Sequence, residues 1–165
     1  MPKEGTINIT AMLTLIIADN ASSVDQFSHI DMRHLLVCVG SNKNGGRGGT
    51  YGKLVPMRFK NGSEIAVFKG KQYAIPHLYN NDDRILYLVY FYMPKFFDLN
   101  PLEKLKVIFH ELYHISPSFN GDIRRMGKVK SAHGSSRKSF DRRFEGALRG
   151  YHDSLSGSEL YRKIG

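Results

Sequence analysis

The sequence is organised around one segment, which reads Asn100-Pro101-Leu102-Glu103-Lys104-Leu105-Lys106-Val107-Ile108-Phe109-His110-Glu111-Leu112-Tyr113-His114-Ile115. Asn100 is a good helix N-cap, Pro101 suits the first helical position, and Glu103 completes a capping box. Apolar residues then recur with the period of an α-helix. Pro117 keeps Ser116 out of the helical region, so the helix cannot continue past that residue. The segment therefore predicts one amphipathic helix between Pro101 and Ser116.

Residues 110–114 of this helix read His-Glu-Leu-Tyr-His, which is an H-E-x-x-H motif. Residues four apart lie on the same helix face, so His110 and His114 can bind one metal ion and Glu111 can reach a water molecule beside it. This arrangement is typical of zinc-dependent metallopeptidases. Two surface histidines without a metal are the weaker interpretation. Core packing does not account for the histidines, because they lie opposite the apolar face formed by Leu102, Leu105, Ile108, Phe109, Leu112 and Ile115.

A third zinc ligand is expected downstream of the motif, because catalytic zinc usually takes three protein ligands and leaves a fourth position open. We expect His133 to be this ligand, since it follows the motif at a distance common in this class and precedes Gly134, which permits a tight backbone. Glu145 is the main alternative. The other downstream groups that could bind zinc are Asp122, Asp141 and His152.

The length of 165 residues predicts a single domain covering 1–165, and a hydrophobic share of 41% is enough for a real core. Cys38 is the only cysteine, which excludes an intrachain disulfide and a cysteine-based zinc site; we expect it in the core, and it fits a cytoplasmic protein. The apolar run 11–18 is too short to span a membrane. It predicts an N-terminal core helix better than a secretion signal, because no positive start precedes it. No membrane contact is expected.

The net charge of +9 and the sequence pI of about 9.7 favour contact with polyanions. Basic residues are concentrated after the motif, although ordinary solvated surfaces also carry such residues. The chain could therefore be a zinc protease that associates with nucleic acid and acts on DNA-bound proteins. The residues expected to contact nucleic acid in that case are Arg124, Arg125, Lys128, Lys130, Arg137 and Lys138.

The rest of the chain predicts a small sheet and two flanking helices. Apolar and β-branched runs predict strands at 33–39, 51–59, 65–68, 72–75 and 84–93, the last covered on both faces beneath the motif helix. Glycine-rich residues 40–49 predict a loop rather than a phosphate cradle. Spacing of four predicts a closing helix through Phe140, Phe144, Leu148 and Tyr151. The expected fold is α+β: a compact zincin-like domain whose small mixed sheet packs against an N-terminal helix, the metal-bearing helix and a C-terminal helix.

Two further segments, Phe119-Asn120-Gly121-Asp122-Ile123-Arg124 and His133-Gly134, extend the motif into a wider pattern. Over residues 51–144 the chain resembles a family of metallopeptidases found in archaea and phages, which is similar to a compact zincin. The resemblance implies that His110, His114 and His133 bind one Zn²⁺ and that Glu111 is the catalytic acid/base. In the family pattern a histidine often follows the arginine segment closely. Here Arg125-Met126 stands at that place, so a role for that histidine does not carry over.

The expected activity is zinc-assisted hydrolysis of peptide bonds in a peptide or protein substrate, with Glu111 moving the proton. The substrate could add as an extra strand to a sheet edge. Tyr113, Arg124 and Arg125 are near the motif in sequence and are candidates for contacts with the substrate or transition state. A non-catalytic zinc-stabilised binding module is the remaining alternative, but a glutamate inside the motif and the lack of thiols disfavour it.

Overall fold

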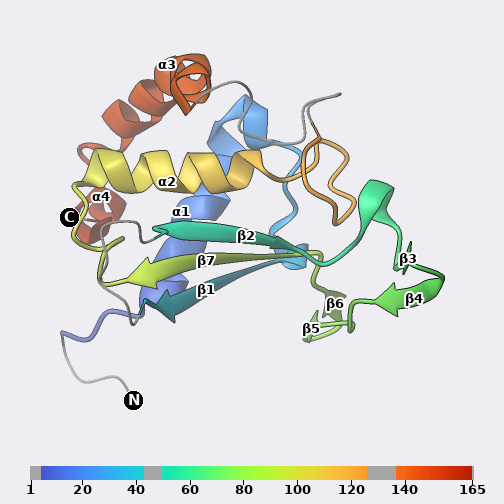
Figure 1. Cartoon of the computed structure of the whole chain (residues 1–165). Helices are drawn as coiled ribbons and strands as arrows, with labels where there is room; N and C mark the ends of the chain where they lie inside the picture. The colour runs from blue at the N-terminus through green and yellow to red at the C-terminus, as the bar shows by residue number, and fades with distance from the viewer. Residues whose placement is uncertain (1–4, 43–49, 126–136, 165) are drawn as a thin grey trace.

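The computed structural model describes residues 5–42, 50–125 and 137–164, and it combines helices with a small sheet and two hairpins (Figure 1). The predicted α+β class is confirmed. The helices are α1 (Ile9–Ser23), α2 (Pro101–Tyr113), α3 (Arg137–Leu155) and α4 (Glu159–Ile164), with short 3-10 helices η1 (Asp25–Phe27), η2 (Met32–His34) and η3 (Lys60–Gly62). The strands are β1 (Leu35–Ser41), β2 (Gly52–Pro56), β3 (Ile65–Phe68), β4 (Lys71–Ala74), β5 (Tyr79–Asn80), β6 (Asp83–Arg84) and β7 (Tyr87–Met93).

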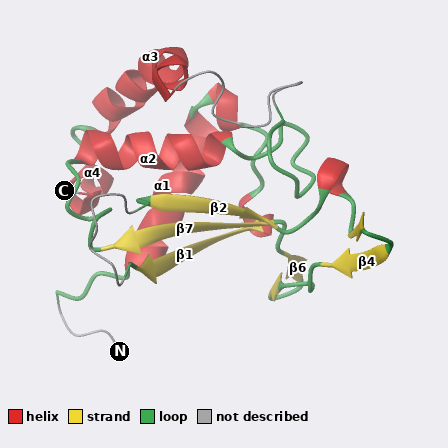
Figure 2. Cartoon of the chain, viewed as in Figure 1, coloured by secondary structure: helices red, strands yellow, loops and turns green. Residues whose placement is uncertain are grey.

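The core lies between the helices and one face of a three-stranded sheet (Figure 2). The strand order is β1-β7-β2, with β1 parallel and β2 antiparallel to β7, so the sheet is mixed as predicted. Val89 lies between Val37 of β1 and Leu54 of β2. Alternate side chains of a strand point to the same face, and the buried set on this sheet is Leu35, Val37, Leu54, Tyr87, Val89 and Phe91.

The prediction that strand 84–93 is covered on both faces is wrong. The face of β7 that points away from the core is only half-buried, at Leu88, Tyr90 and Tyr92. Tyrosine tolerates this position because its ring packs while its hydroxyl remains hydrated, and the rings of Tyr90 and Tyr92 stack with centroids 6.2 Å apart. Cys38 pairs with Tyr90 on this face and is half-buried rather than in the core.

Two predicted strands are shorter than expected, because their backbones leave the sheet. The predicted strand 51–59 ends at Pro56, and the next amide, of Met57, donates to the Leu86 carbonyl. The predicted strand 84–93 becomes β6 and β7, since the two residues before Tyr87 donate to carbonyls outside the sheet. The predicted strand 65–68 is β3, and β4 lies one residue earlier than predicted.

Helix α1 is part of the core, which confirms the interpretation of its apolar run. Asn8 caps it by accepting a hydrogen bond from the Ala11 amide, and Leu13 and Ile16 are fully buried. In the described part of the chain, no helix is both long and apolar enough to cross a membrane.

Helix α2 begins as predicted and ends slightly earlier. The Asn100 side chain accepts a hydrogen bond from the Glu103 amide at 2.9 Å, and Pro101 is the first helical residue. The helix ends at Tyr113 rather than at Ser116. The reason is that the His114 carbonyl accepts the Arg124 amide at 2.7 Å, which draws the following chain into a different path.

The C-terminal helices close the core over α2 and α1. Phe144, Leu148 and Tyr151 of α3 are buried as predicted, while the side chain of Phe140 lies outside the described ones. Helix α4 was not predicted. Lys104 of α2 is buried and donates to the Ile164 carbonyl at 2.6 Å, which caps the end of α4.

Replacing Tyr151 with phenylalanine should destabilise the fold. The buried Tyr151 hydroxyl donates to Asp19 Oδ2 at 2.6 Å and ties α3 to α1, and burial beside this carboxylate raises the pKa of the phenol. A hydrogen bond to a charged group contributes about 2 kcal/mol. We expect Tyr151→Phe to lower the free energy of unfolding by about that amount in urea denaturation. Tyr161→Phe, whose hydroxyl makes a longer 3.4 Å contact with His152, should have a smaller effect.

Candidate metal centre

Helix α2 brings the two motif histidines together. The Nε2 atoms of His110 and His114 lie 3.2 Å apart, and the two rings are nearly perpendicular, with an interplanar angle of 85°. Zinc bound tetrahedrally at ordinary Zn–N distances requires its two nitrogen ligands to be roughly 3.3 Å apart. Both histidines are half-exposed, so an ion and a substrate could reach them. The two side chains therefore fit a shared zinc ion.

Glu111, between the two histidines, is buried although it is a carboxylate. The residue is 7% exposed, and its carboxylate accepts a hydrogen bond from the Leu54 amide of β2. Burial raises the pKa of Glu111 to about 7, and the hydrogen bond from Leu54 acts in the opposite direction. A divalent cation on the neighbouring histidines would favour the charged form. The carboxylate is thus placed between the histidine pair and the sheet.

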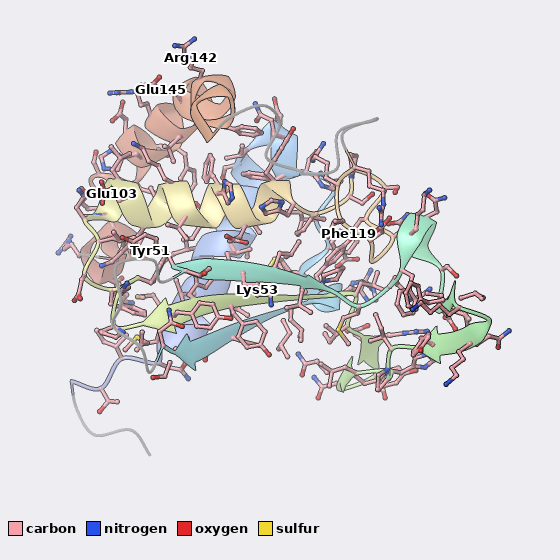
Figure 3. The ribbon with its side chains drawn as sticks, in the orientation of Figure 1. Tyr51, Lys53, Glu103, Phe119, Arg142 and Glu145 are labelled. Atoms are coloured by element: carbon pink, nitrogen blue, oxygen red, sulfur yellow. The ribbon has the colours of Figure 1, made fainter. Side chains whose placement is uncertain are left out.

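Among the described strands, β2 pairs only with β7, so its outer edge is free of strand partners at this point. The Tyr51 carbonyl accepts the Tyr92 amide, and the Met57 amide donates to Leu86, so odd-numbered residues of this segment bond to β7. Backbone groups of an antiparallel strand alternate in direction. The N–H and C=O groups of Gly52 and Leu54 therefore point outward. Pro56 is the next outward-facing residue, and it has no N–H. Figure 3 shows Lys53 on this strand and Tyr51 just before it, beside α2.

Gly52 allows the close approach of α2 to β2. A Cβ atom at this position would lie 3.0 Å from Glu111 Cγ, 3.2 Å from Val107 Cγ1 and 3.2 Å from the Tyr90 carbonyl oxygen. The Tyr90 carbonyl belongs to the sheet and cannot yield, so any larger residue would displace Glu111. The sequence predicts a strand here, but it gives no signal that this glycine meets the motif helix.

The loop after α2 is fixed by a buried tyrosine that sequence reasoning missed. The Tyr87 hydroxyl accepts the Gly121 amide at 2.9 Å and donates to the Asp122 carbonyl at 2.8 Å. Burial raises the pKa of Tyr87 to about 12, so the phenol stays protonated. From this loop the Arg124 amide bonds to the His114 carbonyl. Tyr87 therefore helps to set the end of α2 on which the second histidine lies.

The three residues predicted to contact the substrate or transition state make structural contacts in the part of the chain described, and a substrate role stays a prediction. Arg124 Nε donates to the Tyr113 carbonyl at 2.8 Å, and its guanidinium lies 4.2 Å from the centre of the Tyr113 ring. That ring is buried against Phe144, with centroids 4.9 Å apart. Arg125 forms two hydrogen bonds with Asp122, at 2.9 and 3.0 Å. These contacts hold the loop against α2 and α3.

The predicted third ligand, His133, lies outside the described residues. Among the residues described, no group of three His, Cys, Asp or Glu side chains could hold a metal ion. Asp122 is buried, and both its oxygens accept hydrogen bonds from Arg125 and from backbone amides. Burial acts to raise its pKa, but these bonds outweigh that effect and keep the pKa low.

Glu145, the alternative ligand, is exposed on α3 and bonds to Arg149 in an i,i+4 pair at 2.9 Å. Figure 3 shows Glu145 on the side of α2 that faces away from β2. Glu111 contacts β2, on the other side of the helix. His152 contacts Tyr161 near the end of α3, and the side chain of Asp141 is outside the described ones.

The basic residues predicted to contact nucleic acid are only partly described. Arg124 and Arg125 bind protein groups, as shown above. Lys128 and Lys130 lie outside the described residues, and nothing is described of the side chains of Arg137 and Lys138.

Comparison with known proteins relates the chain to a family of metallopeptidases. No curated protein and no solved structure matches the chain. A family model described as "Putative phage metallopeptidase" matches residues 7–150, which include β2, β7, α2 and the loop after it. The chain belongs to this phage metallopeptidase family.

Proposed function

We propose that the protein is a zinc-dependent peptidase in which His110, His114 and His133 hold one zinc ion per chain and Glu111 is the general acid/base. Membership of a metallopeptidase family supports a metal-dependent peptidase in general. One observation carries the finer proposal: two imidazole Nε2 atoms 3.2 Å apart lie next to a carboxylate that is buried against an edge strand. Two imidazoles are a common part of the donor set of catalytic zinc.

Zinc in this position would supply Lewis-acid activation of a water molecule and of the scissile carbonyl. The Glu111 carboxylate takes a proton from that water and later delivers it to the leaving amine. The Leu54 amide and the absence of a side chain at Gly52 hold Glu111 in the narrow space between α2 and β2. Tyr87 and Arg124 position His114 through the backbone of the following loop.

The free edge of β2 supports an extended peptide as substrate. The outward amide and carbonyl groups of Gly52 and the outward carbonyl of Leu54 can pair with a peptide that adds as a further strand, while the Leu54 amide stays with Glu111. Such a peptide would run past Glu111, because this side chain already reaches the Leu54 amide. The substrate class that follows is a polypeptide in extended conformation.

The first test combines metal content with a variant of the glutamate. We expect about one zinc per purified chain, measured by inductively coupled plasma mass spectrometry. Glu111→Gln should retain this zinc, while cleavage of a fluorogenic peptide library falls by about 10²–10⁴-fold, because an amide cannot accept the proton.

Glu159→Gln is a matched control, since Glu159 is exposed on α4 and pairs with Lys163. It should leave both zinc content and cleavage unchanged. Undiminished cleavage by Glu111→Gln would contradict the proposal. A zinc-loaded wild-type protein that cleaves no peptide would favour the non-catalytic binding module.

The third ligand can be identified by removing each candidate side chain. We expect His133→Ala to weaken zinc binding by at least about 100-fold in a competition titration with a chromogenic chelator. Glu145→Ala should bind zinc as the wild type does, since its carboxylate is exposed and bonds to Arg149. The opposite pattern would make Glu145 the ligand.

Gly52 provides a test of the contact between α2 and β2. Gly52→Ala should displace Glu111 and lower kcat/KM by roughly tenfold to a hundredfold, while zinc content is kept. Gly146→Ala is the control, because a Cβ there meets nothing within 4 Å. Equal activity of the two variants would show that the close approach at Gly52 has no role in catalysis.

A further inference from the structure

The β3–β4 hairpin projects from the body of the molecule (Figure 1). Four of its large apolar side chains are exposed. The exposed fractions are 48% for Ile65, 67% for Val67, 63% for Phe68 and 49% for Tyr73. Ile65 and Val67 lie on one face, and Phe68 and Tyr73 lie on the other. An isolated two-stranded hairpin is marginally stable in water, and an exposed apolar patch marks an interaction site. Both considerations point to a partner that extends this small sheet.

The backbone of β3 has a free outer edge. Lys69 and Gly70 have φ values of 49° and 75°, so the hairpin has a two-residue turn of type I′ and its flanking pair is Phe68 and Lys71. In such a turn the flanking residues Phe68 and Lys71 are hydrogen-bonded to each other, and the backbone groups of successive residues then point alternately toward and away from the partner strand. The N–H and C=O groups of Ile65 and Val67 therefore point away from β4. The Ile65 groups accordingly bond to the Ser63 hydroxyl, at 3.2 and 2.7 Å.

We propose that a second copy of this chain pairs with that edge, β3 against β3 in antiparallel orientation. A two-fold axis normal to the sheet through Ala66 places Ile65 of each copy opposite Val67 of the other. These are the residues whose backbone groups point outward, so two bonded pairs form and replace the Ser63 contacts. The four β-branched side chains then meet on one face. Centring the axis on Val67 would bring Lys69 into the ladder, where its positive φ prevents pairing.

Side-chain type also favours this edge over the outer edge of β4. In the proposed pairing, the tip of each hairpin, with Lys69 and Lys71, lies beside the base of the other. Lys69 then falls opposite Ser63 and next to Glu64, a half-exposed carboxylate that already pairs with Arg58 and Arg84. The outer edge of β4 offers Gln72 and Ala74 at the outward positions, and neither is β-branched. Among the residues described, β4 is the only strand that pairs with β3.

Sedimentation velocity of the full chain across a concentration series tests the association. We expect a reversible dimer, and we expect Val67→Pro to raise its dissociation constant by roughly tenfold or more. Proline is compatible with the hairpin itself, because the Val67 N–H does not bond to β4. A monomer at all concentrations would overturn the proposal.

A disulfide test defines the register and does not depend on peptidase activity. In a Cys38→Ser background, Ala66→Cys places two thiols at the two-fold axis in a non-bonded pair, where Cα atoms lie about 4.5 Å apart, within disulfide range. We expect a covalent dimer after mild oxidation. Tyr73→Cys, the equivalent position on β4, should remain uncrosslinked. Equal crosslinking of the two variants, or a dimer crosslinked by neither, would overturn pairing through β3.

Discussion

The carboxylate of Glu111 is buried against the backbone of β2, and this contact ties α2 to the edge of the sheet. Burying a carboxylate is unfavourable unless it is hydrogen-bonded. The Leu54 amide supplies that bond, and it is available because β2 is antiparallel to β7 and turns this amide outward. The mixed sheet is therefore part of the chemistry of the site: a different pairing of β2 would leave the glutamate without its donor.

The opposite end of α2 depends on a second buried polar group. The Tyr87 hydroxyl lies in the core and must bond to something, and it does so with the loop that follows the helix. This loop returns Arg124 to the last carbonyl groups of α2. A helix end is otherwise prone to fray, because its carbonyl groups lack partners within the helix. Tyr87 and Arg124 thus limit the movement of His114 relative to the sheet.

Local signals predicted α2 closely, since the Asn100 cap, Pro101 and the apolar period all act within a few residues of one another. The same holds for β3, where strand and turn residues are adjacent in sequence. The mixed pairing at β7 could not be predicted, because it depends on contacts between segments far apart in the chain. Gly52 and Tyr87 were missed for that reason: each is an ordinary strand residue until α2 or its loop packs on it. The half-buried outer face of β7 was also missed, since tyrosines in an apolar run resemble core residues.

The outer edges of β2 and β3 are covered differently in the described part of the chain, and the difference bears on what each can do. Edge strands expose unpaired backbone groups that invite other chains. At β2 the outward amide of Leu54 is already bound to Glu111, and Pro56 has no amide to offer. Only a short stretch of backbone therefore remains open beside the histidines. At β3 the only cover shown is the hydroxyl of Ser63, and the side chains there are β-branched and apolar. A polypeptide that pairs briefly suits the first edge, whereas a partner that remains bound suits the second. The same rule of strand pairing thus supports a substrate site and an association site at separate places on one small domain.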